Sequence, residues 1–78
     1  MSVTAYVLIQ TEVGRAERVA KAASDIPGVV TSDNVAGPYD VIVRAESDTL
    51  DELGRLVVSA IQQVEGITRT FTCPIVNL

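Results

Sequence analysis

The sequence predicts one α+β domain in the order β-α-β-β-α-β, with a four-stranded antiparallel sheet and two helices on one of its faces. The β-branched residues Val, Ile and Thr make up 26 of the 78 residues, which favours several strands. The apolar residues change twice from strand-like to helix-like spacing. A shift of 38 residues superposes Gly28 on Gly66, so that each half reads strand, helix, glycine, strand. Two such halves make the ferredoxin-like split β-α-β arrangement.

The first half of the chain is predicted to form a strand, a helix and a second strand. Residues 3–11 are apolar on both faces, as in a strand that is covered on two sides. From about Gly14, apolar residues recur every three to four positions. This spacing predicts an amphipathic helix whose contact stripe is Ala16, Val19, Ala20 and Ala23. Pro27 cannot continue the helix, and residues 29–36 are predicted to form the second strand.

The second half repeats this order after a turn at Gly37-Pro38. Residues 39–45 are predicted to form the third strand, which pairs with the second in a hairpin. Thr49 and Glu52 have the spacing of a capping box, and this predicts that the second helix begins there. The apolar stripe extends the helix to about Val64.

Residues 67–76 are predicted to form the last strand. Strict alternation places Ile67, Phe71 and Cys73 on one face. The other face then carries Thr68, Thr70 and Thr72. Pro74 favours the end of a strand or an edge position.

Length, charge and residue types limit the functions that the chain can carry. A chain of 78 residues forms one small domain. The net charge of -4 and the scattered cations argue against direct nucleic-acid binding. With no histidine and one cysteine, the sequence offers no zinc ligand set, intrachain disulfide or imidazole chemistry, so no metal or cofactor is expected. The sequence shows no signal peptide and no membrane-spanning run, which predicts a soluble cytoplasmic protein.

Two helices can cover only one face of the sheet, yet the predicted strands are apolar on both. The residues that would face solvent in a monomer are Tyr6, Leu8, Val30 and Ile42, or their alternates. Because such patches rarely stay exposed, we expect two protomers to pack sheet against sheet as a homodimer, with higher oligomers formed through edges and loops. The alternative is a wetter face, carrying Ser32, Asn34, Arg44 and the threonines of the last strand.

The sharpest local motif is Gly37-Pro38-Tyr39-Asp40, between the two strands of the hairpin. Glycine lets a ligand approach the backbone, proline stiffens the loop, and Asp40 supplies a carboxylate. The alternative is purely structural, with Gly37-Pro38 making the turn and Asp40 capping a nearby amide. Cys73 has no histidine or second cysteine as a partner, and we expect it to be a buried structural thiol.

Three short segments, taken in order, resemble one protein family. They are Ile-Pro-Gly-Val before the second strand, Gly-x-Tyr-Asp after it, and Val-Glu-Gly-Ile-Thr-Arg-Thr entering the last strand. This order is similar to the effector-binding domain of the Lrp/AsnC transcription regulators, and the resemblance covers residues 3–76. Because the first strand starts at Val3, no helix-turn-helix is expected before it. The sequence thus resembles the family's stand-alone members.

The resemblance implies a non-catalytic sensor of amino acids or related metabolites. It implies dimers formed through the sheets, association of these dimers into rings that often hold eight chains, and ligands bound between dimers. The ligand residues that it implies are Gly37, Pro38, Tyr39 and Asp40, with Thr68 and Thr70 from a neighbouring subunit. It also implies a full-length regulator as a partner in mixed oligomers. Two alternatives stay open: a small enzyme of the dimeric α+β barrel type, such as an isomerase or a cofactor-free monooxygenase, and a purely structural oligomer.

Overall fold

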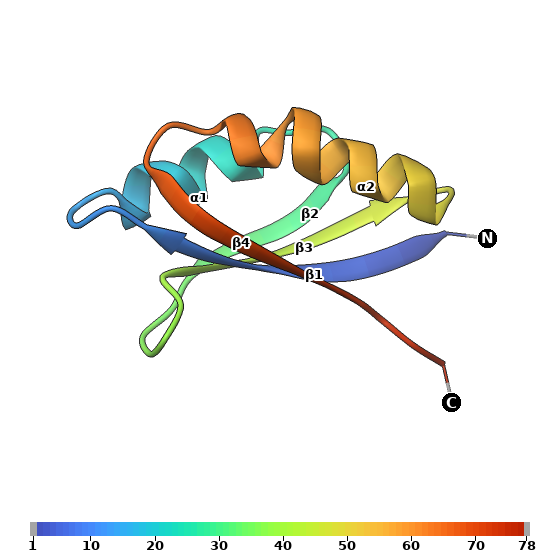
Figure 1. Ribbon diagram of the computed structural model, residues 1–78, viewed down its shortest axis with the longest axis horizontal. Helices are drawn as coiled ribbons and strands as arrows, with labels where there is room; N and C mark the ends of the chain where they lie inside the picture. Colours follow the sequence, from blue (N-terminus) through green and yellow to red (C-terminus); the bar gives the residue numbers. More distant parts are fainter. Residues whose placement is uncertain (1, 78) are drawn as a thin grey trace.

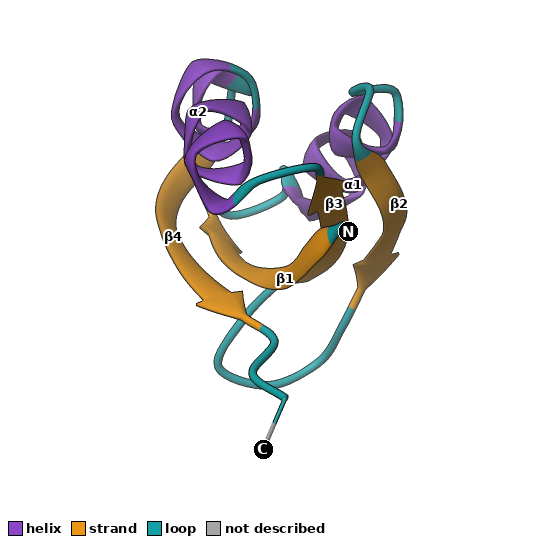
Figure 2. Cartoon of the chain, turned by 90° about the vertical axis from the view of Figure 1, so that its right-hand side faces the viewer, coloured by secondary structure: helices purple, strands orange, loops and turns teal. Residues whose placement is uncertain are grey.

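The computed structural model describes residues 2–77 and has the predicted order of strands and helices. The elements are β1 (Val3–Thr11), α1 (Ala16–Ser24), β2 (Val29–Asn34), β3 (Val41–Ser47), α2 (Leu50–Ser59), the 3-10 turn η1 (Ile61–Gln63) and β4 (Ile67–Pro74). The strands lie in the order β2-β3-β1-β4, and all neighbours are antiparallel. Both helices cover the same face of the sheet (Figures 1 and 2). The predicted ferredoxin-like α+β fold is confirmed.

The hydrophobic core lies between the sheet and the two helices. Four segments each supply three buried residues: every second residue in the two central strands, and residues on one face of the helical turns in the other two segments. The members are Ala5, Val7 and Ile9 from β1; Val41, Val43 and Ala45 from β3; Val19, Ala20 and Ala23 from α1; and Leu53, Val57 and Ile61 from the second helical segment. No helix within residues 2–77 is long and apolar enough to cross a membrane.

The second helix ends earlier than predicted. The Thr49 hydroxyl accepts a hydrogen bond from the Glu52 amide at 3.1 Å, which confirms the predicted N-cap. The α-helix stops at Ser59, and Ala60 leaves helical geometry with φ -122° and ψ -58°. The tighter turn that follows brings Ile61 into the core with no exposed surface. The apolar spacing alone does not reveal this change of pitch, so the predicted end at Val64 was wrong.

The last strand contains a bulge that changes which face its first residue occupies. Gln10 pairs with Arg69 and Thr11 pairs with Ile67, so Thr68 is an extra residue in β4. Ile67 therefore packs against the core, whereas Phe71 pairs with Leu8 on the opposite face. The strict alternation that grouped Ile67 with Phe71 was wrong because it assumed an unbroken ladder.

The two halves share a glycine with a positive φ at the positions that the repeat superposes. Gly28 has φ +99° and Gly66 has φ +101°, and each glycine lies immediately before an edge strand. An added Cβ at Gly28 would lie 2.8 Å from Leu56 Cδ2, and one at Gly66 would lie 3.1 Å from Arg15 Cβ. Both positions therefore require glycine for backbone conformation and for space.

Candidate functional site

The hairpin between β2 and β3 is longer than the predicted two-residue turn. The strands end at Asn34 and begin again at Val41, so residues 35–40 form a loop. The loop projects from the sheet on the side away from the helices (Figure 1). Residues 35–38 are exposed, and Tyr39 and Asp40 are half-buried. Gly37 has φ +131° and open space around it.

The base of this loop is fixed to β1. The Asp40 amide donates to the Ile9 carbonyl at 2.9 Å, and the Val35 amide donates to the Asp40 carbonyl at 3.0 Å. Asp40 Oδ2 accepts from the Thr11 amide at 2.8 Å and lies 3.3 Å from the Thr11 hydroxyl. The Gln10 side-chain amide donates to the Pro38 carbonyl at 3.0 Å. These contacts hold the loop at both ends and leave its tip free.

The tip presents backbone donors that the fold does not use. Among residues 2–77, no acceptor is found for the amides of Gly37 and Tyr39. The Asp40 Oδ1 atom likewise has no partner in this part of the chain, since Oδ2 makes both contacts to Thr11. The loop thus combines two free amide donors with a carboxylate that has one free oxygen, which are the groups that bind the two ends of a zwitterion.

The two threonines implied as ligand residues lie elsewhere on the protomer. Thr68 is exposed at the bulge of β4, and its hydroxyl donates to the Gln10 carbonyl at 3.1 Å. The Thr70 hydroxyl accepts from the Gln62 side-chain amide at 2.9 Å. Both residues line a shallow depression of about 310 Å³, together with Gln62, Ile67 and Arg69. Thr70 pairs with the buried Ile9, so it faces the helices, while the loop projects from the other side.

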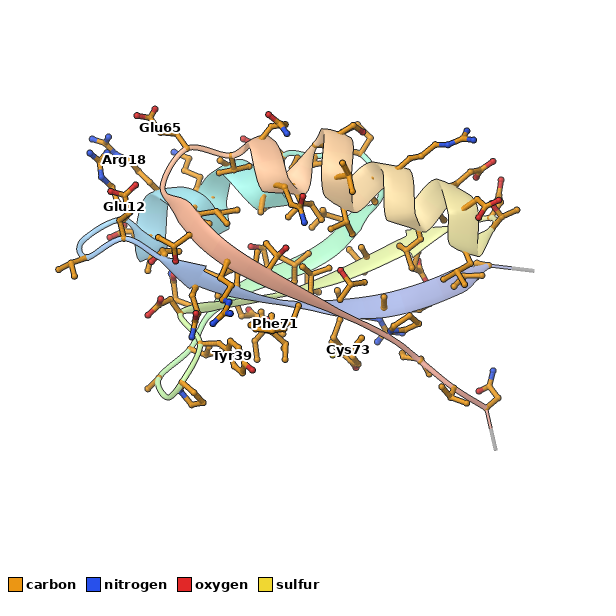
Figure 3. All side chains as sticks on the ribbon, viewed as in Figure 1. Glu12, Arg18, Tyr39, Glu65, Phe71 and Cys73 are labelled. Atoms are coloured by element: carbon orange, nitrogen blue, oxygen red, sulfur yellow. The ribbon has the colours of Figure 1, made fainter. Side chains whose placement is uncertain are left out.

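The uncovered side of the sheet, here called the open face, carries apolar residues in its centre. The register places Ile42, Leu8 and Phe71 side by side across β3, β1 and β4, and Tyr6 next to Cys73. Tyr6 and Phe71 keep 41 and 40 % of their surface exposed. Tyr39, Phe71 and Cys73 lie below the sheet, away from the helices (Figure 3). Of the expected residues, Tyr6, Leu8 and Ile42 lie on this face, and Val30 is an extra residue in the irregular pairing of β2.

Aromatic contacts join the loop to the open face. The Tyr39 and Phe71 rings meet edge to face, with centroids 5.9 Å apart. The Arg69 guanidinium lies 5.3 Å from the centre of the Phe71 ring. The loop and the open face therefore form one continuous surface, and a partner that covers one would contact the other.

The open face also carries a charged residue, Arg44, and a free thiol, Cys73. Arg44 pairs with Tyr6 across the ladder, and its buried Nε atom has no hydrogen-bond partner within residues 2–77. Cys73 is exposed, so the expectation of a buried thiol was wrong. It pairs with Tyr6 across β1 and β4.

Sequence reasoning missed the residues that fix the loop, Gln10 and Thr11. Neither has a recognisable motif. Their role follows from the antiparallel register of β1 and β3, which places the end of β1 beside the hairpin loop. Among residues 2–77, no three His, Cys, Asp or Glu side chains lie close enough together to hold a metal ion.

Comparison with known proteins identifies the family. The family model for the Lrp/AsnC ligand binding domain matches residues 4–77. This chain belongs to that family. A curated relative, an uncharacterized HTH-type transcriptional regulator of Pyrococcus horikoshii, is 31 % identical over 75 residues that cover 92 % of this chain. The chain spans about half the length of the curated relatives it matches, since the aligned part makes up 50 % of each of them.

Several solved structures share this architecture. A protein of Thermus thermophilus has a TM-score of 0.90 and 30 % identity, covering 97 % of this chain and 95 % of its own. A hypothetical protein of Pyrococcus horikoshii has a TM-score of 0.88 and 32 % identity, covering 97 % of this chain and 92 % of its own. The AsnC protein of E. coli has a TM-score of 0.89 at 16 % identity, covering 97 % of this chain and 52 % of its own, so it shares the fold.

Proposed function

We propose that this Lrp/AsnC ligand-binding domain is an oligomeric sensor that binds an amino acid or a related metabolite. Occupancy of the site modulates transcription or metabolism through the assembly of the protein, or through mixed oligomers with a full-length regulator. The observation that carries this proposal is the loop 35–40, whose free amides and carboxylate border the open face. Ligand binding changes an assembly only where the ligand prefers one state of it.

The packing between sheet and helices supports a non-catalytic role. All twelve core residues are apolar, and within residues 2–77 no polar or charged residue is buried. An enzyme of the dimeric α+β barrel type needs a polar cavity in this space. The packed interior therefore favours a binding module over that alternative.

The open face is proposed as the homodimer interface. Leu8, Ile42 and Phe71 form a connected apolar row, and partly exposed rows of this kind mark protein–protein contacts. A twofold axis would place the same row of a second protomer against it. Cys73 and the Nε atom of Arg44 would be covered in the same step.

Phe71→Asp is expected to convert the dimer to monomers, because it places a carboxylate in the centre of the buried interface. The measurement is molecular mass by sedimentation equilibrium or native mass spectrometry. Val13→Asp is the matched control, since Val13 is fully exposed at 103 % and lies outside the sheet. An unchanged mass for Phe71→Asp, or a wild-type protein that is monomeric at micromolar concentration, contradicts the open-face dimer.

The ligand site is proposed to form where a neighbouring dimer meets the loop. The amides of Gly37 and Tyr39 would bind the ligand carboxylate, and Asp40 Oδ1 would bind its ammonium group. Thr68 and Thr70 would come from another subunit, because in one protomer Thr70 and the loop lie on opposite sides of the sheet. A transcriptional regulator of Neisseria meningitidis with this fold was solved in complex with L-Met, at a TM-score of 0.83 and 13 % identity. L-Met is therefore one probe for this chain.

One or more of the twenty amino acids is expected to raise the melting temperature of the wild-type protein. A ligand at one hundred times its dissociation constant adds about 2.7 kcal/mol to the free energy of unfolding. Asp40→Asn is expected to abolish that shift, because it removes the charge while its side-chain oxygen still accepts from Thr11. Asp25→Asn, at the exposed end of α1, is the control and keeps the full shift. A shift that survives Asp40→Asn places the site elsewhere, and the absence of any shift overturns amino-acid binding.

A further inference from the structure

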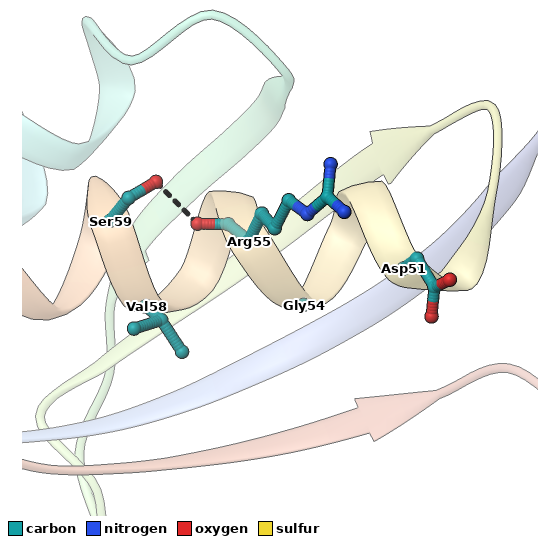
Figure 4. Close-up of a pocket in the computed structure, with 5 residues that line it drawn as sticks. All are labelled: Asp51, Gly54, Arg55, Val58 and Ser59. Atoms are coloured by element: carbon teal, nitrogen blue, oxygen red, sulfur yellow. Dashed lines mark hydrogen bonds between the residues drawn. The ribbon is translucent and has the colours of Figure 1, made fainter.

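The outer side of α2 carries an apolar stripe that the fold leaves uncovered. Leu50, Gly54 and Val58 follow each other at four-residue spacing, so they lie on one side of the helix. Leu50 and Val58 keep 59 and 58 % of their surface exposed. A groove of about 540 Å³ on this side is lined by Asp51, Gly54, Arg55, Val58 and Ser59 (Figure 4).

No contact within residues 2–77 explains the presence of Gly54 in a helix. An added Cβ would meet nothing within 4 Å, and its backbone is not left-handed. A glycine in a helix interior costs about 0.5–1 kcal/mol relative to alanine. Unlike Gly28 and Gly66, it serves no backbone turn and no contact inside the chain. A glycine at the floor of a groove does, however, allow the backbone of another helix to approach closely.

We propose that this groove binds the α2 helix of a second copy of the chain, in antiparallel orientation and crossing near Gly54. In that arrangement Leu50 meets Val58 of the second copy, so both exposed side chains are covered. Twofold symmetry repeats the contact, as in an isologous interface.

The charges beside the stripe select this occupant and this orientation. Asp51 and Arg55 both line the groove, and their side chains leave the helix in different directions (Figure 4). An antiparallel crossing brings Asp51 within one helical turn of Arg55 of the second copy, and the reverse pair forms by symmetry. In a parallel twofold crossing the flank that carries Asp51 and Arg55 lies on opposite sides of the contact in the two copies, so these charge pairs do not form. The groove is therefore complementary to itself.

The area of this contact assigns it to a particular step of assembly. A helix of ten residues is about 15 Å long, so the contact is smaller than the roughly 1,200 Å² of a stable interface. It does not hold two free protomers together. Figure 1 shows α2 on the side of the sheet away from the open face, so both contacts can form at once. The α2 contact then links dimers, where several weak contacts act together.

Cysteine crosslinking tests the α2 contact directly. In a Cys73→Ser background, Gly54→Cys is expected to give a covalent dimer under mild oxidation, because the two positions meet near the twofold axis. Glu17→Cys, exposed on α1, is the matched control and is expected to give severalfold less. Circular dichroism of each variant checks that it is folded. Equal crosslinking of the two variants overturns the proposal.

A charge exchange tests the orientation. Asp51→Arg or Arg55→Asp, each added to the Gly54→Cys chain, is expected to reduce crosslinking severalfold by placing like charges opposite each other. The double exchange is expected to restore it. Singles that crosslink like the parent, or a double exchange that does not recover, contradict the antiparallel pairing. Because crosslinking reports on α2 alone, its result is read separately from that of Phe71→Asp, which tests the open face.

Discussion

Leu53→Ala is expected to lower the free energy of unfolding by about 2–5 kcal/mol, the range measured for large-to-small substitutions in cores. Leu53 belongs to α2, is 1 % exposed and points into the core between that helix and the sheet. Native proteins are stable by only about 5–15 kcal/mol, and a chain this small is at the lower end of that range. The measurement is chemical denaturation at one fixed protein concentration, because association changes the apparent stability.

Leu50→Ala is the matched control for this prediction. Leu50 is the same residue type in the same helix, three positions earlier, and 59 % of its surface is exposed. In the monomeric Phe71→Asp background, where no second α2 covers Leu50, its substitution is expected to change the free energy of unfolding by less than about 0.5 kcal/mol. An equal loss of unfolding free energy for Leu53→Ala and Leu50→Ala would mean that α2 does not pack its Leu53 side against the sheet.

Gly28→Ala is expected to have the second largest effect, a loss of about 1–3 kcal/mol. An L-residue is strained at φ +99°. The new methyl group would also lie 2.8 Å from Leu56 Cδ2 and 3.3 Å from the Glu46 carbonyl oxygen. Glu46 cannot move freely, because its amide donates to the Gly28 carbonyl at 2.8 Å. Thermal unfolding measures this loss, at about 4–8 °C per kcal/mol for a domain of this size.

Two other glycines separate strain from packing in this result. Gly14 also has a positive φ, of +80°, but its added Cβ would meet nothing within 4 Å. Gly14→Ala therefore reports the backbone strain alone and is expected to cost less than Gly28→Ala. In the monomeric Phe71→Asp background, where no second α2 is bound, Gly54→Ala is expected to stabilise the protein by about 0.5–1 kcal/mol through better helix propensity. A loss at Gly28 no larger than that at Gly14 would contradict the close packing against Leu56.

Periodicity was enough to predict most of the fold, because each core element buries one face. The alternation of Ala5, Val7 and Ile9 and the spacing of Val19 and Ala23 each identify a buried stripe, and all five residues are buried. The 38-residue repeat correctly aligned Gly28 with Gly66. The spacing of apolar residues does not show where a strand contains an extra residue or where a helix changes to a tighter turn. The bulge at Thr68 and the break at Ala60 were therefore missed.

The candidate site was predictable only in part, because its contacts join residues far apart in the sequence, such as Thr11 and Asp40. The motif at residues 37–40 located the loop, and its alternative, Asp40 capping a nearby amide, is also seen, at Thr11. The union of that loop with Thr68 and Thr70 came from the family resemblance and stays a prediction. Cys73 is exposed because it lies on the face of the sheet that the helices leave uncovered, and its sequence context alone did not reveal this.

Both outer strands of the sheet contain one residue too many. Val30 in β2 and Thr68 in β4 each interrupt the ladder with the neighbouring inner strand. A kinked border presents its free amides and carbonyls out of line, which makes it a poor template for a passing strand from another molecule. Edge-to-edge pairing of these outer strands with strands of other molecules is therefore disfavoured.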